Sequence, residues 1–419
     1  MAEGPYNLTT ASNLLKTVYR DKITDTVIKS DFLLSSLEKA DPEVWTGGKK
    51  IEWAVDVAPQ TGNYAINNMD GGLLPKPAVR DTVPANADVA DHSATTGITV
   101  DQLDRMKKGE TAYANGLQKA VDDCVKDLRR KVSPQLYRNQ VWTVAADSTG
   151  TTVTLDQVQY IQVGDYLTFG NRTSGAGATV RKVTGKSISA NTITVDSAVT
   201  VTAAASGAWY SGAGPTDTVK IESLDLAAAG VEVSTGAITA RTLHGINSGT
   251  NSTWAGNEKN LSGNAADEDD FYDVMDSMWG REAEAPTEGV TTRGIQRRLM
   301  STYQSQKRYV DTVEVRAGFK GIFLAAPTGE LGLVAQPDVP KGRAYMWNRK
   351  AVELFKGPSE WLDGPDGDTI WRWTVDQSTG QYRAQHEATY RLKLNLLFDK
   401  PAGIGRLYNC ADDKPNIGG

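Results

Sequence analysis

Residues 109–139, GETAYANGLQKAVDDCVKDLRRKVSPQLYRN, decide the fold because they form the longest segment with a helical pattern. Their apolar side chains recur at steps of three and four and predict one buried stripe. The members of this stripe are Tyr113, Leu117, Ala120, Val121, Cys124, Leu128 and Val132. Charged residues fill the other side, and Pro134 marks the expected end or a kink. A helix of about 25–30 residues is about 40 Å long, so we expect a long helix against which other parts of the chain pack.

The residues before this helix predict two segments that reach away from a core. Residues 1–45 are polar with one helical segment, which packs either on its own domain or on a neighbouring subunit. Residues 49–57 alternate apolar and polar side chains and predict a strand. A Gly-, Pro- and Asn-rich stretch follows, and a second extended run covers residues 85–100. An extended chain covers about 3.3 Å per residue. We therefore expect a long hairpin-like arm that ends on another molecule.

Residues 140–216 differ in composition from their surroundings. Charged residues become rare, and short alternating runs rich in Val and Thr are separated by turn residues. The pattern predicts a small β-barrel or sandwich of about five to seven strands. It begins directly after a helix and ends at a Gly-Pro linker, which is typical of an inserted module.

The rest of the chain mixes helices and strands, so the predicted fold class is α+β. Expected helices cover residues 219–229, 267–281 and 294–305. Expected strands cover residues 313–315, 321–325, 331–335 and 343–347, and residues 369–375 are expected to pair with 384–397.

Composition excludes several classes of function. The chain has 419 residues and a net charge of -6, which disfavours tight nucleic-acid binding through clustered Lys and Arg. Two cysteines, Cys124 and Cys410, argue against a disulfide framework and for a reducing compartment. The sequence shows neither a signal peptide nor a run of 18 apolar residues, so we expect folding in the cytoplasm and no membrane span.

No pattern in the sequence predicts catalysis, a cofactor or a metal site. His92, His244 and His386 are isolated from one another and from other ligand residues. Residues 185–187 (GKS) lack the earlier glycine of a phosphate-binding loop and predict a turn. Residues 267–270 (DEDD) fit the start of a helix, and residues 363–368 (DGPDGD) fit a tight turn rather than a calcium loop. We therefore expect a structural protein and not an enzyme.

The order of these parts resembles the tailed-bacteriophage major capsid protein family, with the Hong Kong ninety-seven-like fold. Short motifs in the expected order carry the resemblance: residues 243–247 (LHGIN) before Trp254, 270–279 (DFYDVMDSMW), 292–297 (TRGIQR), 336–345 (QPDVPKGRAY) and 382–384 (YRA). The resemblance covers nearly everything outside residues 140–216.

The resemblance implies a division of the chain into six parts. These are an N-terminal arm (1–45), an extended loop (46–98), a spine helix of the peripheral domain (99–139), an inserted β-domain (140–216), an axial domain (217–360) and the return strands of the peripheral domain (361–419). Trp53, Tyr64, Lys76 and Arg80 are the expected inter-subunit contact residues of the extended loop. Lys49, Lys50 and Lys76 lie where some relatives are crosslinked, but no motif identifies a partner.

The resemblance also implies the partners and the location. Copies of the chain are expected to form hexamers and pentamers of one icosahedral shell in the virion. Further expected partners are a portal protein, a separate scaffolding protein, a decoration protein, and packaged double-stranded DNA bound without sequence specificity. One alternative with the same fold is an encapsulin-like nanocompartment shell. An alternative of another class is a carbohydrate-active enzyme that carries a β-module.

Overall fold

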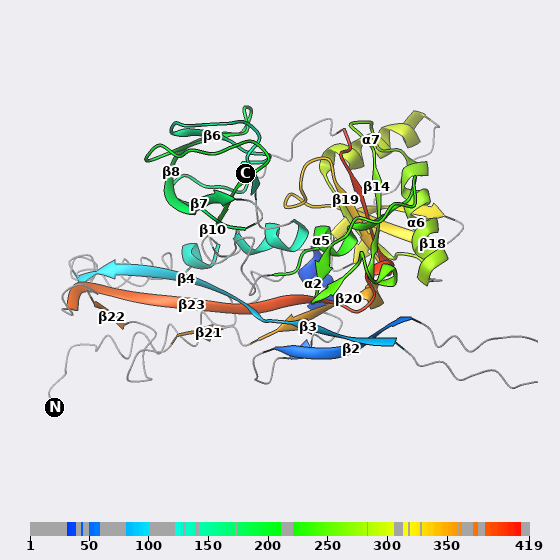
Figure 1. Cartoon of the computed structure of the whole chain (residues 1–419), viewed down its shortest axis with the longest axis horizontal. Helices are drawn as coiled ribbons and strands as arrows, with labels where there is room; N and C mark the ends of the chain where they lie inside the picture. The colour runs from blue at the N-terminus through cyan, green and yellow to red at the C-terminus, as the bar shows by residue number, and fades with distance from the viewer. Residues whose placement is uncertain are drawn as a thin grey trace, which may run out of the picture.

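The chain was analysed as a computed structural model, shown in Figure 1. It describes residues 32–38, 43–44, 50–58, 81–100, 122–126, 128, 131–138, 142–171, 174–210, 221–282, 284–305, 313–316, 319–326, 329–357, 360–362, 372–375 and 382–411. The expectations for the helical segment before residue 32, the loop 59–80 and the turn 363–368 lie outside these residues.

One sheet is organised around the long strand β23 (Tyr382–Phe398). β4 (Ala90–Thr99) runs antiparallel to it, and the two form the long ribbon at the lower left of Figure 1. The other strands of this sheet are β20 (Val352–Lys356), β21 (Glu360–Trp361) and β22 (Arg372–Val375), which pair with β23, and β1 (Glu43–Val44), which pairs with β20. The predicted pairing of residues 369–375 with 384–397 is confirmed by β22 and β23.

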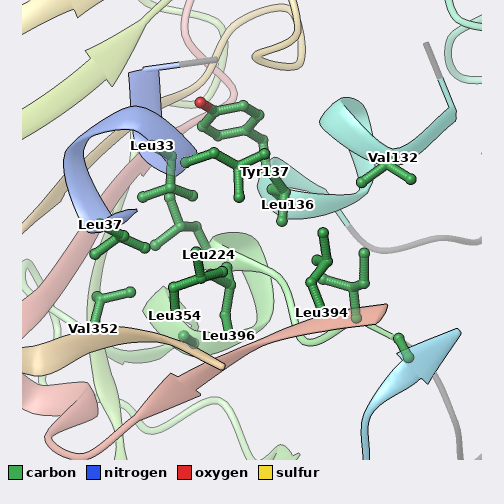
Figure 2. Packing of buried hydrophobic residues seen from close by; sticks show 14 of the residues in the cluster. Leu33, Leu37, Val132, Leu136, Tyr137, Leu224, Val352, Leu354, Leu394 and Leu396 are labelled. Carbon is green, nitrogen blue, oxygen red and sulfur yellow. The ribbon is translucent and has the colours of Figure 1, made fainter. Parts of the chain in front are cut away.

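The main hydrophobic core lies between this sheet and three helical segments. Figure 2 shows leucines of α2 (Phe32–Glu38), of the helical residues 131–137, of α5 (Leu224–Ala228) and of β20 and β23 converging on one another. Each fully buried leucine contributes about 1.5–3 kcal/mol relative to an exposed one. Because α2 packs here, on its own chain, the described part of the N-terminal arm needs no neighbouring subunit for its burial.

The helix predicted from residues 109–139 is described at residues 122–126, 128 and 131–137, all of which are helical. The stripe residues Cys124, Leu128 and Val132 are buried, as predicted. The expected stop at Pro134 is wrong, since the helical residues continue to Tyr137. The carbonyl of Pro134 still accepts the backbone N–H of Arg138 at 3.2 Å, and the turn is therefore completed beyond the proline.

A second sheet has eight strands in the order β11-β14-β24-β19-β15-β18-β17-β16. Its strands are β11 (Gly230–Glu232), β14 (Gly256–Asn260), β15 (Glu288–Thr291), β16 (Val313–Arg316), β17 (Phe319–Ala326), β18 (Gly329–Ala335), β19 (Ala344–Trp347) and β24 (Ile404–Tyr408). β19 shows how both faces are covered, because Ala344 and Met346 enter one buried cluster and Tyr345 and Trp347 enter the other. α6 (Glu268–Glu282) and α7 (Arg293–Ser305) cover the first face, and α5 covers the second.

The two sheets divide the chain differently from the expected boundary at residue 360. β20 lies before that boundary yet pairs with β23, and β24 lies after it yet pairs with β14 and β19. The last strand, β24, therefore belongs to the eight-stranded sheet and not to the sheet organised around β23. The helix expected at residues 219–229 is also shorter than predicted. It begins only after Ser223, whose side chain accepts the N–H of Leu226 as an N-cap.

Residues 142–210 form a six-stranded sheet with a core of its own. The strand order is β5-β10-β7-β8-β9-β6, with β5 (Trp142–Thr143), β6 (Thr152–Thr154), β7 (Tyr166–Asn171), β8 (Thr179–Ser187), β9 (Thr192–Val195) and β10 (Ser206–Tyr210). A bridge between Val144 and Leu155 joins the two ends of this order, so the sheet closes on itself as a small barrel. Residues 185–187 lie in β8, and the turn predicted there follows at residues 188–191.

Two glycines allow α5, β11 and β14 to approach one another closely. Gly230 lies opposite Gly256 in the parallel pair β11–β14. A Cβ at Gly256 would lie 2.5 Å from the carbonyl oxygens of Ala227 and Ala228. Backbone atoms cannot move aside as the end of a flexible side chain can. A larger residue at either position therefore requires the helix and the sheet to separate.

Replacing Gly256 by Ala is expected to lower the free energy of unfolding by about 2 kcal/mol or more, because the added methyl group overlaps backbone atoms. The matched control is Gly150→Ala, where a Cβ meets nothing within 4 Å. Urea unfolding followed by circular dichroism measures both. Equal midpoints for the two variants would contradict the assigned close approach.

Candidate assembly surface

The β2–β3 ribbon leaves the body of the protein at the lower right of Figure 1. β2 (Ile51–Ala58) and β3 (Asp81–Ala87) pair antiparallel, from Ile51 opposite Ala87 to Ala58 opposite Asp81. The side chains of Ile51, Trp53 and Val55 are half-buried and Val57 is buried, while the residues between them are exposed. This is the alternation that the sequence predicts.

The root of this ribbon is fixed to a hairpin of the same chain, β12 (Thr242–Leu243) with β13 (Ile246–Asn247). The backbone N–H of Asn86 donates to the carbonyl oxygen of His244 at 2.9 Å. On the other strand, the hydroxyl of Thr253 in η1 (Ser252–Trp254) donates to the carbonyl oxygen of Val57 at 2.9 Å. Asn86 lies at the base of the ribbon, opposite Glu52, and Val57 lies near its other end, beside Ala58. The ribbon is thus held to its own chain at both ends of its described length.

His244 is the central side chain of this anchor. Its ring lies 5.1 Å from the ring of Trp53 and 5.8 Å from that of Phe398, measured between centroids. Its Nε2 accepts the backbone N–H of Phe398 at 3.2 Å, which requires the neutral form with the proton on Nδ1. Burial and the positive charge of Arg241 lower the pKa of His244 to about 3. The imidazole is therefore neutral at pH 7.

Acidification is expected to weaken this anchor. Because the folded pKa of His244 lies below 6.5, the unfolded chain binds the proton first and stability falls as pH falls below 6.5. The loss attributable to this side chain at pH 4 is about 3 kcal/mol. Exchanging His244 for Asn, which tolerates the φ of 51° and does not titrate, should remove that part of the pH dependence. Urea unfolding of both proteins at pH 7 and pH 4 measures the difference, and parallel pH profiles would contradict the prediction.

A buried ionic cluster fixes α5 to the eight-stranded sheet, next to the anchor. The carboxylate of Asp225 contacts the guanidinium groups of Arg343 and Arg406, the latter at 2.8 Å. Tyr345 donates its hydroxyl to the same carboxylate at 3.1 Å. Arg406 also pairs with Glu258. Burial alone would raise the pKa of Asp225, but the charges of Arg406 and Arg343 outweigh it and lower the pKa to about 2.

Arg241 connects the ionic cluster to the anchor hairpin. It donates to the carbonyl oxygens of Ala227 and Ala229 at 2.7 Å and of Trp254 at 3.1 Å. These carbonyls lie at the end of α5 and in η1, where the backbone has no further helical donor. Burial lowers the pKa of Arg241 to about 9, which keeps it charged at pH 7. The guanidinium group of Arg241 thus holds α5, η1 and its own segment before β12 together.

Of the four expected inter-subunit contact residues, Trp53 is described and Tyr64, Lys76 and Arg80 lie outside the described residues. Trp53 is half-buried against His244 of its own chain, where it orients the ribbon. Lys50 forms an ion pair with Glu52 on the same strand, and Lys49 lies outside the described residues. The inter-subunit contact roles of all four residues stay predictions.

The acidic residues at the start of α6 satisfy the helix end rather than a metal. The backbone N–H of Asp270 donates to Asp267 Oδ1 at 3.1 Å, and the N–H of Asp267 donates to Asp270 Oδ2 at 3.0 Å. No group of three or more His, Cys, Asp or Glu side chains that could hold a metal ion occurs in the described part of the chain. Cys124 and Cys410 are both buried free thiols. None of the described helices is long and apolar enough to cross a membrane.

Sequence reasoning missed Asp225, Arg241 and His244 as organising residues. Two of them lie far in sequence from their partners: Arg406 follows Asp225 by 181 positions, and Phe398 follows His244 by 154. The carbonyl groups that Arg241 contacts are 12 to 14 positions away, but no periodic pattern marks them. The only local signal was the LHGIN motif, in which His244 and Gly245 both adopt positive φ values. That motif contributed only to the family resemblance, and its contact with β2 and β3 was not predicted.

Comparison with solved structures identifies the fold. A capsid protein from the capsid of Cyanophage A-1(L) has a TM-score of 0.51 and 13% identity, and the match covers 92% of this chain and 94% of that one. The gene transfer agent capsid (TM-score 0.41, 11% identity, 90% and 91% covered) and an encapsulin from Synechococcus elongatus (0.43, 9%, 90% and 87%) are also similar. No protein-family model matches the sequence, and the comparison with curated proteins found no match. The chain therefore has the fold of phage capsid proteins.

Proposed function

We propose that the chain is the major capsid protein of a tailed bacteriophage. Copies of it assemble as hexamers and pentamers into an icosahedral head shell that encloses double-stranded DNA. The observation that carries the proposal is a capsid fold with a two-stranded ribbon that is hydrogen-bonded to its own chain near both ends. The role is structural rather than enzymatic.

In this proposal the residues between β2 and β3 lie over an adjacent subunit, with Tyr64, Lys76 and Arg80 among the contact residues. The Asn86–His244 contact holds the base of the ribbon and the Thr253–Val57 contact holds it near residue 58, which together set its direction. Rigid placement lowers the conformational entropy lost when the contact forms. Many such contacts, each of moderate size, together stabilise a closed lattice.

The proposal also assigns roles to the remaining parts. The helical residues 122–126, 128 and 131–137 belong to one spine helix over residues 109–139. The barrel of residues 142–210 is an insertion in the capsid fold that projects outward or braces neighbouring copies. A portal protein, a separate scaffolding protein and a decoration protein complete the head, which assembles in the host cytoplasm.

Negative-stain electron microscopy of the purified chain tests the shell. We expect closed particles of uniform diameter, while discrete small oligomers at all concentrations would contradict the proposal. Electron micrographs of particles from the producing cells then separate the phage head from an encapsulin-like nanocompartment. Heads filled with DNA and carrying tails support the first, and tailless shells with a protein cargo support the second.

A further inference from the structure

The exposed faces of α6 and α7 carry opposite charges. On α6, the exposed residues Asp269, Asp273 and Asp276 follow one another at steps of four and three and end beside the exposed ring of Trp279. On α7, Arg297 and Arg298 are exposed, and the helix contains no acidic residue. We call these surfaces the acidic face and the basic face.

Within one chain these faces do not neutralise each other. Asp273 pairs with Lys259 of the neighbouring strand β14. Among the described residues, Asp269, Asp276, Arg297 and Arg298 form no ion pair. The charges of both faces are therefore available to a second molecule.

The two helices lie toward opposite ends of the same sheet face. α6 packs on β14 and β24, and α7 packs on β18, with β19 and β15 between them in the strand order. Both helices lie at the upper right of Figure 1, away from the β4–β23 ribbon. A second copy displaced along the sheet in a head-to-tail manner would thus bring its basic face to the acidic face of the first.

Trp279 supplies the apolar part of such a contact. Its side chain is 51% exposed although it belongs to a helix whose other large apolar residues are buried. Exposed tryptophans are enriched among residues that dominate the binding energy of interfaces, where charged residues surround them at the rim. The acidic face therefore offers a large apolar side chain as well as negative charge.

We propose that the acidic face of α6 in one copy binds the basic face of α7 in the next copy. The contact is heterologous, and in the proposed shell the rotation between successive copies closes it into a ring. The inference rests on the proposed shell function and deepens it by naming the surfaces that join neighbouring copies within one ring. The apolar residues of α7 are buried against its own sheet, so Trp279 packs against the aliphatic stems of the partner's Arg297 and the partner's Arg298, while the carboxylates pair with their guanidinium groups.

Charge exchange tests the proposal in the full chain. The first variant is Asp269→Arg with Asp276→Arg, the second is Arg297→Glu with Arg298→Glu, and the third combines all four substitutions. Lys182→Glu, on the exposed side of β8 in the barrel, is the control. The measured quantity is the protein concentration at which half of the chain sediments as shells. Because the exchanged residues are exposed, each variant is expected to fold, and circular dichroism checks this.

The first two variants are expected to raise that concentration at least about tenfold, because like charges then face each other across the contact. The combined variant should return to within about threefold of the wild type, since opposite charges meet again. Failure of the wild type to form shells would overturn the proposed function itself. With a normal wild type, the α6–α7 contact is overturned if either reversed face assembles like Lys182→Glu or if the combined variant does not recover.

Discussion

Replacing Asp225 by Asn is expected to lower the free energy of unfolding by about 3–5 kcal/mol. The substitution keeps the shape of the side chain but leaves Arg343 and Arg406 without their shared counterion. Arg406 keeps its ion pair with Glu258, but the half-buried Arg343 loses the carboxylate with which it pairs, and Tyr345 loses its charged acceptor. Asp225 lies on α5, and both arginines lie on or beside strands of the eight-stranded sheet. Loss of the carboxylate charge therefore weakens the attachment of the helix to the sheet.

The pH dependence of the difference in unfolding free energy between the wild type and Asp225→Asn is a second test of the ion pairs of Asp225. The folded pKa of Asp225, about 2, lies below the ordinary value of 3.8. Its stabilising effect is therefore complete above pH 4 and lost as pH falls from about 4 to about 2. Urea unfolding at pH 7 and pH 3 should show a smaller gap between the wild type and Asp225→Asn at the lower pH. Asp123→Asn, at an exposed helical position, is the matched control. A gap below 1 kcal/mol at pH 7 would contradict the role assigned to the cluster.

Removing the loop between β2 and β3 is expected to abolish shell formation while the body still folds. Ala58 and Asp81 lie opposite each other in the ribbon, so an Asn-Gly turn in place of residues 59–80 closes the hairpin without moving its strands. Closing a two-residue loop in place of a long one is expected to stabilise the ribbon by about 2 kcal/mol, so the deletion does not unfold the body. Because residues 59–80 are proposed to contact the next copy, the concentration needed for shells should rise at least about a hundredfold without them, or about 3 kcal/mol per copy.

A loop of equal length built from Gly and Ser is the control for this deletion. It preserves reach and removes side-chain contacts, so it should fail to assemble as the deletion does. Thermal unfolding of both variants verifies that the body is intact, and sedimentation measures assembly. Shells formed by either variant at the wild-type concentration would show that the loop is dispensable.

Local sequence patterns predicted the elements well where one face of an element is buried. The alternation in β2 and the stripe at Cys124, Leu128 and Val132 each matched the side chains that the structure buries. The helices expected at residues 267–281 and 294–305 correspond to α6 and α7. These patterns depend on neighbours three or four positions away, or two positions away in a strand, and a single sequence contains them.

Sheet membership was harder to predict because it depends on partners far apart in the chain. Nothing in the residues of β24 indicates that it enters the eight-stranded sheet while β23, directly before it, belongs to the other sheet. The same limit applies to the site. Trp53 was identified as important from its place in the arm, but its contact with His244 depends on a hairpin almost 200 residues later.

Sedimentation velocity of the purified chain over a range of concentrations tests the central claim, that copies of the chain assemble through segments that leave the body. The account predicts that single chains of 45.2 kDa coexist, above a threshold concentration, with one large species of fixed sedimentation coefficient. A protein that remains a 45.2 kDa monomer at every concentration would contradict it.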